Sequence, residues 1–293
     1  MTGIGRCFRR FAPSLVVPCA VVVVAASSAQ ILAESPRPGR VQSAASVLSA
    51  AFANRYEVDA NSRIELVMRN GAGEESRRKV QYLTKMIGQR LHSIARITAP
   101  EYLRGMTILT IEQRDRSHDA FVFLPALGKT RRVTTAQKGD AFFGSDLTYE
   151  DLERKRIDEF ELGELAVAEY EGEAVYRIGG ALVRKGNYSR IEFDVAQSDR
   201  AILATRYYKR GEQRPYRVLE APRSAMVAQK GHVLPTRLLA SDVRRGTETE
   251  VLITGLHVNP SISDRIFTVG TLEQERKLPE PEPEPELEPE TKY

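Results

Sequence analysis

The chain has 293 residues, of which 43 are basic and 39 acidic, giving a formal net charge of +4, and it contains two cysteines. Both cysteines lie within the first 19 residues, which excludes a disulfide framework or a thiolate metal site from the rest of the chain. No nucleic-acid-binding motif occurs, and the positive excess lies between the two ends of the chain, where it suits an acidic surface such as lipid headgroups.

The first 29 residues have the layout of a secretory signal peptide. Three arginines within the first ten residues precede an apolar run over residues 11–26, and Ser27 and Ala29 are the small residues expected before a cleavage site at Gln30. The alternative is a single membrane anchor, but two prolines interrupt the run and it is short for a span. We therefore predict that residues 1–29 are removed on export and that the mature protein is periplasmic.

Residues 30–42 are predicted to form a linker, and the apolar pattern after them predicts one helix followed by many strands. Val47, Leu48, Ala51 and Phe52 have the spacing of an amphipathic helix over residues 43–57. Beyond residue 63 the apolar period is that of strands, and turn residues recur between short runs. The predicted strands cover residues 64–68, 79–83, 91–97, 106–112, 120–124, 174–178, 191–195, 201–208, 216–220, 233–240, 250–256 and 266–269. Such spacing indicates a mainly β protein with a large antiparallel sheet, curled or closed, and disfavours a doubly wound fold.

Two segments interrupt this pattern. Residues 146–156 have the chemistry of a short helix that Asp146 or Thr148 could cap. The acidic, proline-rich segment 273–293 ends in alternating proline and glutamate, which can neither pair backbone groups nor bury apolar area. It is therefore predicted to be a disordered tail, which leaves residues 43–272 as one domain.

A block between residues 96 and 152 carries a more specific pattern. It contains RITAP (96–100), RGM (104–106), FVFLPALGKTRR (121–132) and FFGSDLTYEDL (142–152). These stretches resemble the LolA-like family of outer-membrane lipoprotein-sorting proteins, and a looser similarity extends from Ala45 to Leu272. One position departs from the family: Phe121 stands where the family usually has tryptophan, and this chain contains none.

The resemblance implies an antiparallel sheet curled into an incomplete barrel, with helices covering the open side and an apolar cavity between them. The candidate lipid-binding residues are Phe121, Phe123, Phe142 and Phe143. Phe121 and Phe123 would share one face of a strand, and the alternative is that they are plain core residues. Arg131 and Arg132 are candidates for contact with a lid or an acidic headgroup, the alternative being surface strand charges.

The sequence contains no recognisable catalytic arrangement. Its four histidines are scattered, and Ser145 lacks the second glycine of a nucleophile elbow, so we interpret it as a turn or cap residue. Glu150 and Asp151 lie beside three basic residues, which favours a solvated, charged helix face over an acid–base pair. We predict no catalytic residue, no metal site and no cofactor.

Two hypotheses of function remain. The first is a carrier that shelters the acyl chains of a lipid or an acylated lipoprotein for outer-membrane sorting or export, with an inner-membrane exporter as a partner and peripheral contact with the membrane. The second is a non-enzymatic module for envelope-stress regulation or scaffolding that binds a protein partner. Neither hypothesis includes nucleic acid as a partner.

Overall fold

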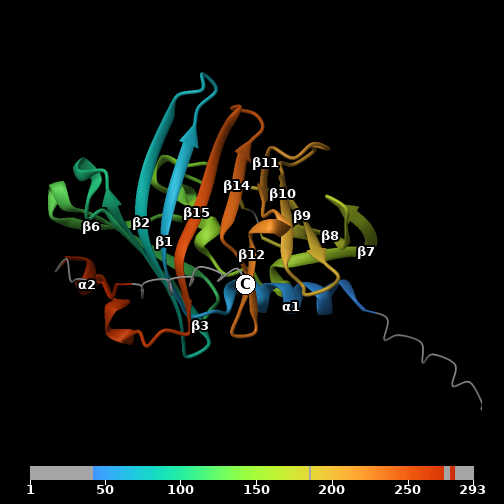
Figure 1. Ribbon diagram of the computed structural model, residues 1–293, viewed down its shortest axis with the longest axis horizontal. Coiled ribbons are helices and arrows are strands. Elements are labelled where there is room, and N and C mark those ends of the chain that lie inside the picture. The colour runs from blue at the N-terminus through green and yellow to red at the C-terminus, as the bar shows by residue number, and fades with distance from the viewer. Residues whose placement is uncertain (1–41, 185, 274–277, 281–293) are drawn as a thin grey trace, which may run out of the picture. The chain divides into compact units, whose positions relative to one another are not determined.

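The computed structural model describes residues 42–184, 186–273 and 278–280 (Figure 1). The predicted signal peptide, the linker up to residue 41 and the tail beyond Glu280 lie outside the described residues. The chain divides into two units at Val41, and the fold is that of the second unit.

A single 13-stranded antiparallel sheet dominates this unit, which confirms the predicted mainly β fold. Its strand order is β6-β5-β4-β3-β2-β1-β15-β14-β11-β10-β9-β8-β7, so β6 and β7 are the two edges and the sheet is not closed into a barrel. A separate two-stranded sheet pairs β12 with β13. The strands are β1 (Ala60–Arg69), β2 (Glu75–Ile87), β3 (Arg90–Ala99), β4 (Thr107–Glu112), β5 (His118–Leu124), β6 (Lys129–Val133), β7 (Phe160–Tyr170), β8 (Glu173–Leu182), β9 (Arg190–Ala196), β10 (Ile202–Tyr208), β11 (Arg217–Glu220), β12 (Met226–Gln229), β13 (His232–Pro235), β14 (Arg237–Asp242) and β15 (Thr247–Val258).

The strand predictions differ from the structure in three ways. The predicted strand 233–240 is two strands, because β13 ends at Pro235, which cannot donate a ladder hydrogen bond. The predicted strand 266–269 is a 3-10 turn followed by helix α2 (Val269–Glu273), and its apolar residues cover the sheet instead of joining it. β6, β7 and β12 were not predicted.

Alternate residues of β2 to β5 face opposite sides of the sheet, and both sides are covered. We call the side that carries Val80, Ile108 and Val122 the inner face, and the side that carries Leu83 and Phe123 the outer face. Segments from elsewhere in the chain cover both faces, so these strands are apolar on both sides, as the pattern of residues 120–124 indicated.

Helix α1 (Ala44–Tyr56) covers part of the inner face, on β7, β8 and β9 (Figure 1). The Ser43 hydroxyl caps it by accepting from the Ser46 N–H at 3.1 Å. Its apolar side chains enter a cluster with β8 and β9, where the Phe52 and Phe193 rings meet edge to face at 5.2 Å. The predicted helix is confirmed.

The chain after β15 covers the outer face over β2 to β5. Phe267, Leu272 and Leu278 pack against Leu83 and Phe123. Two further contacts hold this cover at the Pro279 carbonyl, which accepts from Asn61 Nδ2 at 2.9 Å and from Gln81 Nε2 at 2.5 Å. The packed part of the chain therefore extends beyond residue 272, where the sequence placed the start of a disordered tail, because Leu278 gives the segment an apolar anchor.

We expect Leu278→Ala to lower the free energy of unfolding by about 2–4 kcal/mol, since it removes a fully buried side chain from a packed cluster. Urea unfolding of the full chain measures this. Leu287→Ala removes the same atoms from the Pro/Glu-rich tail and serves as the control, with an expected change below about 0.5 kcal/mol. Equal effects of the two variants would show that Leu278 does not anchor the segment.

Candidate functional site

Residues 134–159, which we call the inner segment, connect β6 to β7 across the inner face of the sheet. The segment contains four short 3-10 helices: Thr135–Gln137, Phe142–Gly144, Tyr149–Leu152 and Ile157–Glu159. The single helix predicted over residues 146–156 is therefore absent. Thr148 caps the third short helix in a capping box with Asp151, as the sequence allowed.

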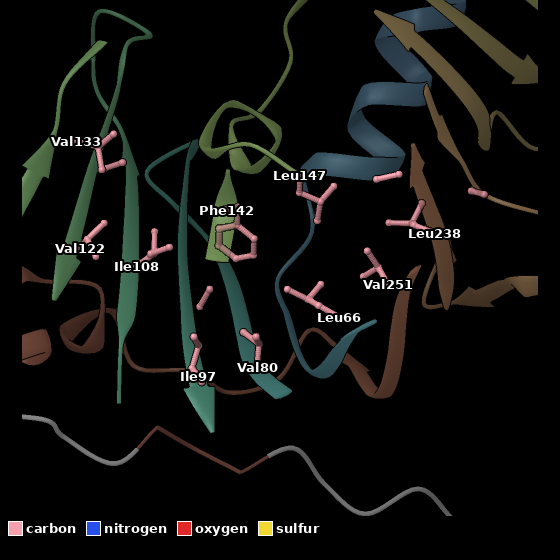
Figure 2. Packing of buried hydrophobic residues seen from close by; sticks show 14 residues of the cluster. Leu66, Val80, Ile97, Ile108, Val122, Val133, Phe142, Leu147, Leu238 and Val251 are labelled. Carbon is pink, nitrogen blue, oxygen red and sulfur yellow. The ribbon is translucent and has the colours of Figure 1, made fainter. Parts of the chain in front are cut away.

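The middle of the inner segment inserts apolar side chains into the inner cluster. Phe142 and Leu147 are buried there with Leu66, Val80 and Val122, and Figure 2 shows Phe142 lying among the side chains of these strands. The Phe143 ring lies against that of Phe142 at 4.4 Å between centroids, with the two planes tilted by 39°. These side chains cover apolar residues of the inner face.

A first polar anchor holds the segment to β15 through Asp146. Its carboxylate accepts from Thr247 Oγ1 at 2.5 Å, Thr249 Oγ1 at 2.8 Å and Arg245 Nη2 at 3.0 Å. The Asp146 N–H donates to Thr249 Oγ1 at 2.9 Å. The Ser145 hydroxyl donates to the Phe142 carbonyl at 2.6 Å, so Ser145 is the turn residue that the sequence predicted.

A second anchor is a buried ion pair between Asp151 and Arg217 of β11. Arg217 Nη2 donates to Asp151 Oδ1 at 2.8 Å, Nη1 donates to Oδ2, and the Tyr207 hydroxyl lies 3.1 Å from Oδ1. Burial alone would raise the pKa of Asp151, but the Arg217 guanidinium outweighs it and holds that pKa below its usual range. Asp151 is therefore not on a solvated helix face, which corrects the sequence interpretation.

A third anchor holds the end of the inner segment to the C-terminal residue of β4, Glu112. Glu112 is 1% exposed and its carboxylate accepts from Arg156 Nη1 at 3.2 Å and from the Leu91 N–H at 2.8 Å. Arg154 lies 3.4 Å from the same carboxylate and also pairs with Glu57, just after α1. One buried carboxylate thus links the segment, the sheet and the helix.

A buried histidine lies close to this third anchor. His118 Nδ1 is 3.7 Å from Glu153 Oε2. Burial, together with the charge of Lys138 and three further cations, lowers the pKa of His118 to about 3. His118 is consequently neutral at physiological pH and adds no charge to the anchor.

The structure separates the predicted site residues into two groups. Phe121 and Phe123 point to the outer face, under the C-terminal cover, whereas Phe142 and Phe143 lie on the inner face. The four rings therefore do not line one wall. Arg131 and Arg132 are exposed on edge strand β6, where Arg132 pairs with Asp119 of β5.

A small cavity of about 40 Å³ lies between α1 and the inner face. Tyr56, Asp151, Tyr207 and Leu219 are among its lining residues. The volume corresponds to about three water molecules. An acyl chain can therefore reach the apolar inner face at this place only if α1 or the inner segment moves.

Within residues 42–184, 186–273 and 278–280, no group of three or more His, Cys, Asp or Glu side chains has the arrangement of a metal site. None of the described helices has the length and apolarity needed to cross a membrane.

The sequence matches a family model over residues 90–274, which includes the inner segment and, apart from Glu57, the residues of the three anchors. The family is described as "-like: Uncharacterized protein". The chain belongs to this family. No curated protein matches the sequence.

Solved structures show the same fold. A domain from Vibrio parahaemolyticus assigned to outer membrane lipoprotein sorting has a TM-score of 0.72 at 18% identity, over 78% of this chain and 97% of that one. A DUF1329 family protein from Desulfovibrio piger has a TM-score of 0.67 at 23% identity, over 73% and 91%. A LolA superfamily protein from Nitrosomonas europaea has a TM-score of 0.62 at 19% identity, over 78% and 99%. The LolA-like fold expected from residues 96–152 is confirmed.

Proposed function

We propose that the protein is a non-enzymatic periplasmic carrier that binds the acyl chains of a lipid or lipoprotein on the inner face of its sheet, after the inner segment is displaced. The observation that carries the proposal is the construction of this face. Its apolar side chains are covered by a segment without regular α-helix or long strands, fastened at separate polar anchors. The likeness to lipoprotein-sorting domains supports the same function.

The free energy of burying an acyl chain can be compared with the cost of displacing the inner segment. Burial of an acyl chain contributes about 0.8 kcal/mol per CH₂, or on the order of 12 kcal/mol for a chain of roughly 16 carbons. Exposing Phe142 and Leu147 would cost about 1.5–3 kcal/mol each. Each hydrogen bond of an anchor that water replaces costs about 1 kcal/mol net. A long acyl chain can thus offset the exposure of these two side chains together with the release of one anchor, and a short one cannot.

The proposal includes the N-terminal segment of the chain and the partners of the protein. Residues 1–29 would direct export to the periplasm and be removed there, and an acylated lipoprotein or lipid would be the cargo. An inner-membrane exporter is the partner that fits a carrier in this compartment. Intact-mass measurement of periplasmic protein tests the cleavage, and a mass that includes Met1 would exclude it.

The carrier function is tested by titrating the folded protein with fluorescent fatty-acyl probes of increasing length. We expect uptake to rise steeply with length between roughly 8 and 16 carbons, because each CH₂ adds to the affinity while the cost of opening is fixed. Lipid extracted from protein purified from its native periplasm should contain long acyl chains. Absence of both uptake and co-purified lipid would reject the carrier and favour the protein-binding module.

A further inference from the structure

Two short loops lie together at one end of the sheet, where β3 and β5 end and β4 and β6 begin. Each loop contains one 3-10 turn. The loops pack against each other at Gly105, where an added Cβ atom would lie 3.1 Å from Pro125 Cγ. We call these two loops, together with the first three residues of β6, the rim (residues 100–106 and 125–131).

The rim exposes two large apolar side chains. Tyr102 is 76% exposed and Leu127 is 63% exposed. The other large apolar side chains that are exposed in the described part of the chain are four valines, each in a different element or turn. Leu103 and Met106 are partly buried against the inner cluster, and the guanidinium carbon of Arg78 lies 6.0 Å from the centroid of the Tyr102 ring. The two exposed side chains therefore project from packed loops.

Cations are in excess over carboxylates in the rim. Lys129 and Arg131, at the start of edge strand β6, are exposed and pair with no carboxylate in the described part of the chain. Arg104 is also exposed, and it pairs at 2.5 Å with Glu101, the one acidic residue of the rim. Two unpaired cations thus follow the loop that exposes the leucine.

The same half of the sheet contains most of the positive charge of the folded unit. Residues 75–133, from β2 to β6, have 12 basic and 5 acidic side chains, an excess of +7. Residues 160–258, from β7 to β15, have 15 and 13, an excess of +2. An uneven charge of this kind attracts an anionic surface, and at physiological salt the cations within about 8 Å of that surface contribute most.

The rim lies beside the inner segment. Leu103 of the rim packs against the same apolar cluster as Phe143 and Tyr149 of the inner segment. Burial raises the pKa of Tyr149, and two charges also act on that pKa: Arg131 lowers it and Asp140 raises it. A surface that meets the rim is therefore close to the segment that covers the inner face.

We infer that the rim docks the protein on an anionic phospholipid bilayer, with Tyr102 and Leu127 at the level of the headgroups and Lys129 and Arg131 on the lipid phosphates. Tyrosine suits this position because its ring is apolar and its hydroxyl is polar. Each lysine or arginine close to an anionic bilayer strengthens binding by about fivefold. Basic residues on an edge strand also prevent pairing with another sheet, but that role gives no reason for Tyr102 and Leu127 to be exposed beside them.

A bilayer fits the rim better than a protein partner does. Two apolar side chains on short loops offer little contact area, whereas a stable protein interface takes about 800 Å² from each partner. Weak, reversible binding to a bilayer needs only a small apolar contact combined with several cations. The membrane contact of the carrier hypothesis is in this way assigned to named residues, and to that extent the inference rests on the proposed function. Docking would bring the inner segment close to the lipid that supplies or receives acyl chains.

Co-sedimentation of the protein recovered from the periplasm with phospholipid vesicles tests the rim. We expect binding to vesicles of equal parts phosphatidylcholine and phosphatidylglycerol, and binding about tenfold weaker or less to phosphatidylcholine alone. Lys129→Gln/Arg131→Gln should weaken binding to the mixed vesicles by about tenfold or more. The control is Lys230→Gln/Arg265→Gln, which removes the same charge at two exposed residues that lie outside both the rim and β2 to β6. The control should stay within about twofold of the wild type.

A second pair of variants tests the apolar contact. Tyr102→Ser/Leu127→Ser should weaken binding to the mixed vesicles by about tenfold or more, because both side chains lose their contact with the bilayer. The control is Val167→Ser/Val183→Ser, which removes apolar side chains that are 73% and 57% exposed elsewhere on the surface. It should stay within about twofold of the wild type. Circular dichroism checks that each variant is folded.

Equal losses in a rim variant and its control would overturn the inference, as would the absence of vesicle binding by the wild type. A stable protein complex that the rim variants lose, without binding to vesicles, would assign the rim to a protein partner instead. The outcome is separable from that for the carrier. Vesicle binding without uptake of the fatty-acyl probes would reject only the carrier. Uptake of these probes by a wild type that does not bind vesicles would reject only the docking of the rim.

Discussion

Asp151→Ala is expected to lower the free energy of unfolding by about 3–5 kcal/mol, because it leaves the buried guanidinium of Arg217 without its counter-charge. Both side chains of the pair are at most 6% exposed, so bulk water has little access to the guanidinium. The variant also removes the acceptor of the Thr148 N–H, and with it the cap of a short helix in the inner segment. Urea unfolding followed by circular dichroism measures the change.

Two further variants isolate the cause of that loss. Asp158→Ala makes the same substitution in the same segment, but Asp158 is half-exposed and pairs with Arg116 and, at 3.5 Å, with Arg156 of the third anchor. Pairs this exposed contribute about 0–1 kcal/mol. Asp151→Leu combined with Arg217→Met replaces the pair by apolar side chains and should recover much of the stability. A loss below 1 kcal/mol in Asp151→Ala would show that the pair does not fasten the inner segment.

The sequence predicted the sheet well because its period-2 pattern is strong wherever a strand is buried on at least one face. The strands from residue 60 to residue 124 and from residue 173 to residue 258 were found within a few residues of their ends, apart from β12 and the division of one predicted strand into β13 and β14. β7 was missed because its glutamates interrupt the apolar pattern. Most residues of this edge strand are partly or fully exposed, and Val167 is 73% exposed.

The anchors were missed for a different reason. Asp151 is followed closely in sequence by Arg154, Lys155 and Arg156, and local spacing made these its natural partners. Its actual partner, Arg217, is 66 residues away. One signal of the anchors was present in the sequence, which is the clustering of Ser145, Asp146 and Asp151 within the block FFGSDLTYEDL. In the structure these polar residues hold the inner segment in place.

The predicted phenylalanine site shows the limit of strand parity. Parity correctly placed Phe121 and Phe123 on one face, but it could not say which face of the sheet this was. The face is defined by the segment that covers it, which is either the inner segment or the C-terminal segment. Both segments are irregular, so their positions could not be predicted from an apolar period. Because the C-terminal segment covers Phe123, the proposed acyl site lies on the inner face instead, where Phe142 occupies the place of the acyl chain.

Phe142→Ala is expected to raise the apparent affinity for a long fatty-acyl probe by about 10- to 100-fold while lowering the free energy of unfolding by about 3 kcal/mol or more. The apparent dissociation constant equals the intrinsic one divided by the fraction of molecules whose inner face is open. Removing the Phe142 ring weakens the closed state, in which the ring is buried among strands of the inner face, and leaves the strands that would contact the probe intact (Figure 2).

Phe123→Ala is the matched control, because it removes the same atoms from a ring that is equally buried, but on the outer face. It should cost a similar 3–5 kcal/mol and leave probe affinity unchanged, because the outer face is closed by the C-terminal segment and not by the inner segment. Both titrations are made at a temperature at which circular dichroism shows each variant to be folded. A gain of affinity in both variants would indicate general loosening of the fold, and weaker binding by Phe142→Ala would make Phe142 a wall of the site. Only a gain confined to Phe142→Ala is consistent with a side chain that occupies the place of the ligand in the closed state, because the opening of the inner face then limits the affinity.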